Sequence, residues 1–169
     1  MTVRMMTVRI FAVLVIGGLV LALNGCGGPP PRLEVGAAMP AFELPDLDGR
    51  MVKSRDLAEK PMVINFWATW CGNCRAEMPA LQELAANGTR VVGIALDEGG
   101  AAAVRPFVEE KGIAYDVLIG NQKVFEKFSG LGIPHTVVVD PAQNIAAIYR
   151  GALPEQELRA QLQRIASGG

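Results

Sequence analysis

The chain has 169 residues, of which 16 are Lys or Arg and 17 are Asp or Glu, so its formal net charge is -1. This length is enough for a single globular core. The lysines and arginines are scattered and form no basic block, which argues against a nucleic-acid-binding protein.

The N-terminal segment predicts export. Two arginines precede an uncharged apolar run at 10–23, an arrangement typical of a signal sequence and a little short for a standard transmembrane helix. The run ends in Leu23-Asn24-Gly25-Cys26, which resembles the cleavage box of bacterial lipoproteins. We expect residues 1–25 to be a signal peptide and Cys26 to become a lipid-modified first residue. The alternative is an uncleaved signal anchor, and both would tether the domain outside the cytoplasm, facing the periplasm in a Gram-negative cell.

The Gly- and Pro-rich stretch that follows, at 26–36, predicts a semi-rigid tether. Residues 37–169 are then expected to form one domain. The chain has three cysteines, so in an exported protein one of them is left over after a disulfide pairs the other two. A lipid on Cys26 would leave Cys71 and Cys74 as one redox pair.

The stretch at 66–74 places two cysteines one helical turn apart, directly after an apolar strand. Residues 62–67 predict a buried strand, and 75–86 predict a helix. Cys71 therefore falls at a helix start, where unpaired amides and the helix dipole stabilise a thiolate. Cys74 is within disulfide reach but more shielded. We expect Cys71 to be the reactive sulfur and Cys74 the resolving sulfur.

A zinc site is the alternative explanation of two cysteines at this spacing. A structural zinc ion would require two further thiolate or imidazole ligands. Besides the pair itself, the chain offers only Cys26 and His135. We therefore expect no metal and no other cofactor.

The rest of the chain predicts a mixed α/β order. Strands are predicted at 90–96, 115–119, 136–140 and 145–150, and helices at 101–111, 121–128 and 154–166. Pro106 is expected to break or start its helix. The last two strands are expected to pair as a hairpin, and the last helix to close the fold.

The strand and helix around the cysteines resemble those of the thioredoxin superfamily, and more closely the TlpA/ResA-like, membrane-tethered thiol-disulfide oxidoreductases of bacteria. Four further features carry the resemblance, which covers about 37–167: Pro79 in the active-site helix, Gly132-Ile133-Pro134 before a strand, Glu77, and the redoxin-like opening segment at 36–49. The resemblance implies an α/β thioredoxin-like fold, with a mixed central sheet flanked by helices, extra N-terminal strands and a central insertion.

The resemblance also implies how a partner is bound and attacked. Reduced Cys71 would attack a partner disulfide, after which Cys74 would attack Cys71 and release the reduced partner. Trp70 and the loop of Ile133 and Pro134 would flank the sulfur, and the backbone of Ile133 would pair with an extended partner segment.

Two positions depart from the pattern of the relatives. Asn65 stands where thioredoxin has a buried aspartate, so a base for the buried thiol would have to be Glu77 or water. The alternative for Glu77 is a solvated helix residue. His135, which follows Pro134, is expected either as a polar residue at a strand edge or as a cation that stabilises the thiolate of Cys71.

We therefore expect an extracytoplasmic thiol-disulfide oxidoreductase that acts as a reductant. The resemblance implies exported disulfide or dithiol proteins as partners, for example apocytochrome c, and a membrane thiol reductant upstream. Three alternatives remain. An oxidase that inserts disulfides shares every residue named, and a binding module would use the disulfide only structurally. A peroxiredoxin-like peroxidase is disfavoured because Thr69 lies two residues before Cys71, whereas that family presents Thr-x-x-Cys.

Overall fold

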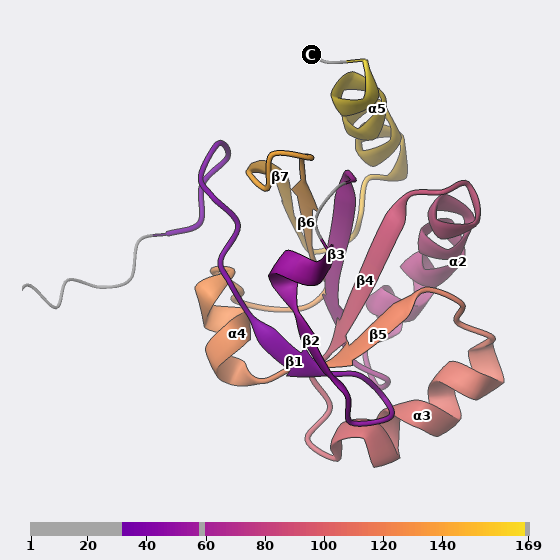
Figure 1. Cartoon of the computed structure of the whole chain (residues 1–169). Coiled ribbons are helices and arrows are strands. Elements are labelled where there is room, and N and C mark those ends of the chain that lie inside the picture. The colour runs from indigo at the N-terminus through magenta and orange to yellow at the C-terminus, as the bar shows by residue number, and fades with distance from the viewer. Residues whose placement is uncertain (1–31, 58–59, 168–169) are drawn as a thin grey trace, which may run out of the picture. The chain divides into compact units, whose positions relative to one another are not determined.

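The computed structural model describes residues 32–57 and 60–167. A five-stranded sheet with the order β5-β4-β3-β6-β7 forms their centre (Figure 1). Its strands are β3 (Met62–Trp67), β4 (Arg90–Ala95), β5 (Asp116–Ile119), β6 (His135–Val139) and β7 (Ile145–Arg150). β3, β4 and β5 run parallel, whereas β6 is antiparallel to β3 and β7 to β6. The predicted mixed sheet and the predicted C-terminal hairpin are confirmed.

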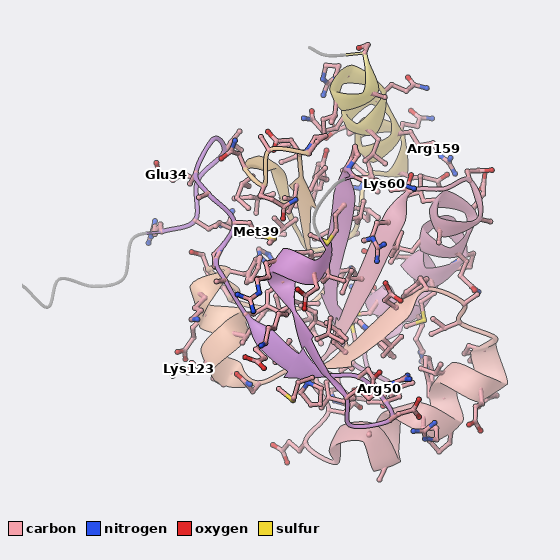
Figure 2. The ribbon with its side chains drawn as sticks, viewed as in Figure 1. Glu34, Met39, Arg50, Lys60, Lys123 and Arg159 are labelled. Carbon is pink, nitrogen blue, oxygen red and sulfur yellow. A yellow bond between two sulfur atoms is a disulfide. The ribbon has the colours of Figure 1, made fainter. Side chains whose placement is uncertain are left out.

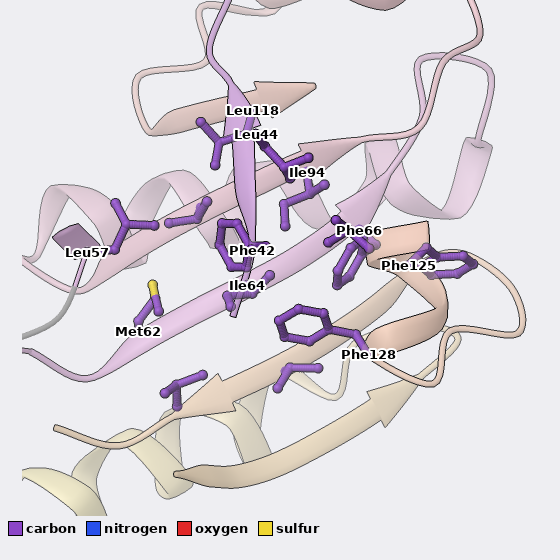
Figure 3. Packing of buried hydrophobic residues seen from close by; sticks show 14 of the residues in the cluster. Phe42, Leu44, Leu57, Met62, Ile64, Phe66, Ile94, Leu118, Phe125 and Phe128 are labelled. Atoms are coloured by element: carbon purple, nitrogen blue, oxygen red, sulfur yellow. The ribbon is translucent and has the colours of Figure 1, made fainter. Parts of the chain in front are cut away.

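Strand β3 lies in the middle of the sheet, and all six of its residues are buried. A strand covered on both faces needs a nearly continuous apolar run, which the sequence supplies with Asn65 as the one polar residue. Successive side chains point to opposite faces. Ile64 and Phe66 therefore join one core cluster, whereas Val63 and Trp67 join another. Figure 3 shows the first cluster, in which Phe66 packs against Phe125 and Phe128.

Helices α2 (Gly72–Ala86), α3 (Gly100–Lys111) and α5 (Glu155–Ala166) bury apolar side chains in the cluster that contains Trp67. Short α4 (Gln122–Lys127) contributes to the opposite cluster. Arg159 of α5, labelled in Figure 2, lies 2.9 Å from a carboxylate oxygen of Glu83 on α2. The sheet is thus covered on both faces, and α2 and α5 are joined on one of them.

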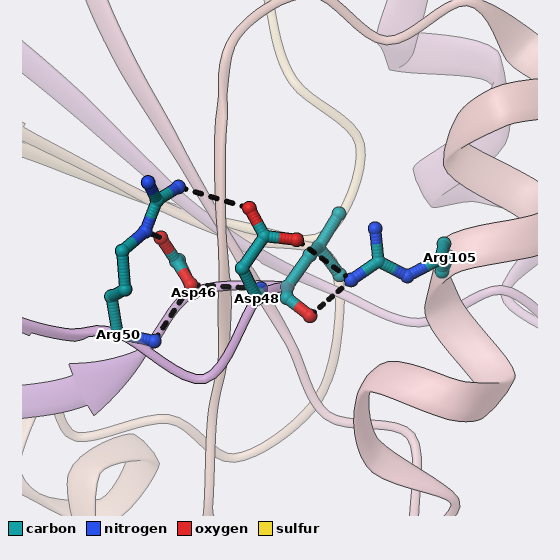
Figure 4. Close-up of polar contacts among 5 residues, drawn as sticks. Asp46, Asp48, Arg50 and Arg105 are labelled. Atoms are coloured by element: carbon teal, nitrogen blue, oxygen red, sulfur yellow. Dashed lines mark hydrogen bonds and ion pairs between the residues drawn. The ribbon is translucent and has the colours of Figure 1, made fainter.

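The predicted N-terminal strands form a hairpin of β1 (Glu43–Pro45) and β2 (Met51–Lys53), followed by the 3-10 helix η2 (Ser54–Leu57). Asp46 shapes the turn, because its Oδ1 accepts the backbone amides of Asp48 at 2.8 Å and Arg50 at 2.9 Å. Arg105 of α3 reaches Asp48 at 3.0 Å (Figure 4). The turn of the hairpin is thereby attached to α3.

One sequence prediction of the fold is wrong. Helix α3 runs without a break from Gly100 to Lys111 and contains Pro106 in its interior. Pro106 is exposed, whereas the neighbouring Val104 is buried and Phe107 packs partly against the same cluster. Packing of the apolar residues therefore holds the helix together although the proline lacks a backbone donor.

The predicted signal peptide at 1–25, Cys26 and the tether up to residue 31 lie outside the described residues. Leu33 is buried in the core, and its amide donates to Oγ of Ser129 at 2.7 Å. Packing is thus already present before residue 37. Within 32–57 and 60–167, no helix is both long and apolar enough to cross a membrane.

Candidate active site

The two neighbouring cysteines lie where β3 ends and α2 begins, and a disulfide joins Cys71 to Cys74. Cys71 is the N-cap of α2, so its sulfur faces the first turn and accepts the Cys74 amide at 3.2 Å. An amide and the positive end of a helix at this position stabilise negative charge on the sulfur. Cys71 is 7% exposed and Cys74 is fully buried. Of the two sulfurs, that of Cys71 is therefore the more accessible to a partner.

Two large apolar side chains are strongly exposed, one next to Cys71 in sequence and one in the loop that precedes Ile133. Trp70 directly precedes Cys71 and is 71% exposed, and Leu131, two residues before Ile133, is 89% exposed. Leu131 was not predicted as a site residue, although its position between two glycines signals an exposed loop. Apolar side chains that remain exposed next to a reactive group are typical of a partner-binding surface.

Ile133 and Pro134 form the loop that leads into β6, and the peptide bond between them is cis. Ile133 is partly buried and packs against both core clusters. The carbonyl of Pro134 accepts the amide of Gly151 at 2.9 Å. Among residues 32–57 and 60–167, no backbone–backbone hydrogen bond outside the helices and strands involves Ile133.

Glu77 lies on α2 one turn after Cys74, and it is buried. Its Oε1 accepts the amide of Leu153 at 2.7 Å, and its Oε2 lies 3.5 Å from Nδ2 of Asn65. Asn65 also donates to Oγ1 of Thr136 at 2.9 Å. Burial raises the pKa of Glu77 to about 7, and the two hydrogen bonds that it accepts only partly oppose this. A carboxyl group with this pKa can both accept and donate a proton near neutral pH.

A groove of 220 Å³ opens beside α2 and connects Glu77 to the surface. Its walls come from α2, from the segment that precedes α5 and from the first residue of α5, and they consist of Asn73, Ala76, Glu77, Ala80, Ala152, Leu153 and Glu155. The carboxyl group of Glu77 can therefore exchange protons with solvent through a short path.

His135 is fully buried, and its Nε2 lies 2.9 Å from the carbonyl oxygen of Phe128. In the β3–β6 register it is paired with Phe66, so its side chain points to the sheet face opposite α2. Its ring packs against Phe66 and Phe125. Burial lowers the pKa of His135 below its ordinary value. These contacts favour a neutral imidazole inside the aromatic cluster and give no support to a cation beside Cys71.

Asp97, which was not predicted from the sequence, contacts the loop that leads to the cysteines. Asp97 follows β4 and is buried, and it accepts the backbone amide of Thr69 at 3.1 Å. The hydroxyl of Thr69 donates to the same carboxylate. The signal that would have revealed Asp97 is its position, because functional residues of parallel sheets gather at the carboxyl ends of neighbouring strands.

Comparisons with known proteins agree with this geometry. Residues 35–148 match the AhpC/TSA family. The chain is 34% identical over 142 residues to the thiol-disulfide oxidoreductase ResA of Oceanobacillus iheyensis, covering 79% of this chain and 73% of that protein. It is 32% identical over 134 residues to the thiol:disulfide interchange protein DsbE of Pseudomonas fluorescens biotype C, covering 78% and 75%.

A solved structure supports the same assignment. The thiol:disulfide interchange protein of the thioredoxin family from Chlorobium tepidum superposes with a TM-score of 0.66 at 27% identity, covering 78% of this chain and 97% of that one. The family match covers more than half of the chain, and the disulfide lies at the start of α2. The chain therefore belongs to the AhpC/TSA family and is one of its thioredoxin-like thiol-disulfide oxidoreductases.

Proposed function

We propose that this oxidoreductase reduces disulfides in exported proteins outside the cytoplasm, through Cys71 as the attacking sulfur. The observation that carries the proposal is the position of Cys71. It caps α2, its sulfur receives the Cys74 amide, and it is the more exposed member of the pair. A thiolate is the attacking species in thiol-disulfide exchange, so the residue with the better stabilised and more accessible sulfur acts first.

The reaction consists of two exchanges. The Cys71 thiolate attacks a partner disulfide, forms a mixed disulfide and releases one partner thiolate. The Cys74 thiol then loses its proton and attacks Sγ of Cys71, which frees the second partner thiolate and leaves the Cys71–Cys74 disulfide. Two electrons pass to the partner, and an external dithiol must return them. We assign the proton of Cys74 to Glu77, since a buried carboxyl group with a pKa of about 7 is suited to accept it.

Trp70 and the loop of Ile133 and Pro134 are proposed to hold the partner. Exposed Trp70 supplies an apolar contact beside the sulfur. The backbone groups of Ile133 would pair with an extended partner segment as an added strand. We leave His135 out of this machinery, because its contacts keep it among aromatic side chains.

Location and partners form the finer part of the proposal. The apolar N-terminal run and the Leu23-Asn24-Gly25-Cys26 box support export and a lipid on Cys26. Relatives named ResA and DsbE support a place among exported thiol-disulfide exchange proteins. We propose exported disulfide proteins as substrates, among them apocytochrome c during cytochrome c maturation, and a membrane dithiol protein as the source of electrons.

The reduction potential of the Cys71–Cys74 pair tests the direction of electron flow. Full-length protein would be equilibrated with glutathione buffers and the fraction of disulfide measured by thiol alkylation. A potential near that of thioredoxin, about -270 mV, supports the reductase, whereas one near that of DsbA, about -120 mV, would make the protein an oxidase. A pair that resists dithiothreitol would instead indicate a structural disulfide.

Reduction of insulin by dithiothreitol, followed by turbidity, tests the activity itself. The wild-type protein should accelerate it, and Cys71→Ser should not. Cys26→Ala is the matched control, because it removes a cysteine outside the pair. Equal activity of wild type and Cys71→Ser would refute the proposal.

A further inference from the structure

Asp97 contacts the loop that presents the reactive cysteine, from the end of the neighbouring strand. It lies two residues after β4, where it is 9% exposed. One carboxylate accepts both the amide and the hydroxyl of Thr69. Within the part of the chain that the structure describes, Thr69 supplies both groups that donate to the Asp97 carboxylate, its backbone amide and its hydroxyl. A charged acceptor forms stronger hydrogen bonds than a neutral one.

The loop between β3 and α2 is short, and each of its ends is fixed by the backbone. The carbonyl of Trp67 accepts the amide of Leu96 at 2.9 Å, which continues the sheet. The amide of Cys71 donates to the carbonyl of Ala68 at 3.1 Å, which closes a turn. Thr69 lies inside that turn, so its bonds to Asp97 determine how the turn is oriented on the sheet.

The residue left without such a constraint is Trp70, which lies between Thr69 and Cys71 and is strongly exposed. An exposed tryptophan contributes more to partner binding when the backbone that carries it is already fixed, because ordering a mobile segment on binding costs entropy. The same turn sets the direction in which Sγ of Cys71 faces a partner. Asp97 thus influences Trp70 and Cys71 indirectly, because its hydrogen bonds go to Thr69 and not to either of them.

We propose that Asp97 is a positioning residue for thiol-disulfide exchange, which fixes Thr69 so that Trp70 and Cys71 meet a protein partner in a preset orientation. The inference rests on the function proposed above, in which Trp70 contacts the partner. Asp97 itself exchanges no proton and forms no covalent bond in this role. The carbonyl of Asp97 also accepts a hydrogen bond from the amide of Gly100, the first residue of α3, at 3.0 Å. Asp97 therefore links the turn that contains Thr69 to the start of α3.

The test compares a protein disulfide with a small one in full-length variants. Asp97→Ala should raise KM for insulin about tenfold, the size of one good interface contact. With hydroxyethyl disulfide, a small molecule that needs neither the Trp70 contact nor one fixed approach to Sγ of Cys71, the rate should change less than about twofold. Asp97→Asn keeps an acceptor oxygen for Thr69, so its KM for insulin should stay close to that of the wild type. Glu98→Ala, at an exposed acid next in the chain, is the matched control and should behave as wild type.

Thr69→Val and Thr69→Ser make the test independent of whether Asp97→Ala folds. Valine removes the hydroxyl and should raise the insulin KM, whereas serine keeps it and should not. Equal losses on insulin and hydroxyethyl disulfide, or unchanged kinetics in both Asp97→Ala and Thr69→Val, would overturn the inference. A wild-type protein that reduces neither disulfide would instead refute the proposed function, so the two failures are distinguishable.

Discussion

The pKa of Glu77 makes the stability of this protein depend on pH in an unusual direction, and Glu77→Gln should abolish that dependence. Glutamine keeps the side-chain length and an oxygen for the amide of Leu153, but it has no proton to lose. The wild-type carboxyl group is buried, and burial raises its pKa from 4.5 to about 7. Most paired carboxylates behave in the opposite way, because their charged form is stabilised in the folded state.

The sign and size follow from proton linkage. Between pH 4.5 and about 7, the folded protein holds the Glu77 proton that the unfolded chain has released. The contribution of Glu77 to stability is therefore complete below pH 4.5 and is lost as the pH rises through 7. One pKa unit corresponds to about 1.4 kcal/mol, so this loss amounts to about 3 kcal/mol in the free energy of unfolding.

Urea unfolding of the disulfide-bonded protein at several pH values measures this effect. The quantity to compare is the difference in the free energy of unfolding between wild type and Glu77→Gln, because other groups titrate equally in both. The variant should gain about 3 kcal/mol relative to wild type between about pH 4.5 and about pH 8. A difference that stays constant over this range would show that Glu77 is charged in the folded protein at neutral pH, and the proton-acceptor role would lose its basis.

The other predictions concern the cysteines and the core. In the reduced protein near neutral pH, substoichiometric alkylation should label Cys71 before Cys74, and Cys74→Ser should accumulate mixed disulfides with partners; faster labelling of Cys74 would reverse the assigned roles. Cys26→Ala should release the protein from membranes, and full retention would favour the uncleaved anchor. Gly93→Ala should cost about 1–3 kcal/mol in urea unfolding, because its Cβ would lie 2.8 Å from Nε1 of Trp67; an unchanged midpoint would mean that the indole moves freely.

The sequence predicted best those elements whose signals are local. The mostly apolar run at 62–67 coincides with β3, because a central strand buried on both faces is marked by its own composition. The predicted helix at 75–86 ends where α2 ends, but α2 begins earlier, at Gly72. The helical composition becomes clear only from residue 75, but the expected helix start at Cys71 is confirmed, because Cys71 is the N-cap of α2.

Contacts between residues distant in sequence could not be predicted in this way. The bond from the Leu153 amide to Glu77 spans 76 positions, and that from Thr69 to Asp97 spans 28. No local pattern marks either pair. The side of the sheet on which His135 lies depends on the β3–β6 register, and a shift of one residue would turn it to the other face.

The position of Glu77 explains how this chain can manage without an acid on its central strand. Asn65 on β3 and Glu77 on α2 point into the same buried space, with 3.5 Å between Nδ2 and Oε2. The carboxylate of Glu77 comes from α2 and not from the strand. It accepts a hydrogen bond from the Leu153 amide and lines the groove beside α2. Asparagine at 65 then serves as a donor to Glu77 and Thr136, a role that an ionised aspartate could not fill. Asn65→Asp should therefore place two carboxyl groups against each other and raise the pKa of at least one of them, because like charges at this distance cannot both ionise freely. The measured consequence would be a shift of the pH profile of the second exchange step toward higher pH, and an unchanged profile would mean that the two side chains do not share a site in solution.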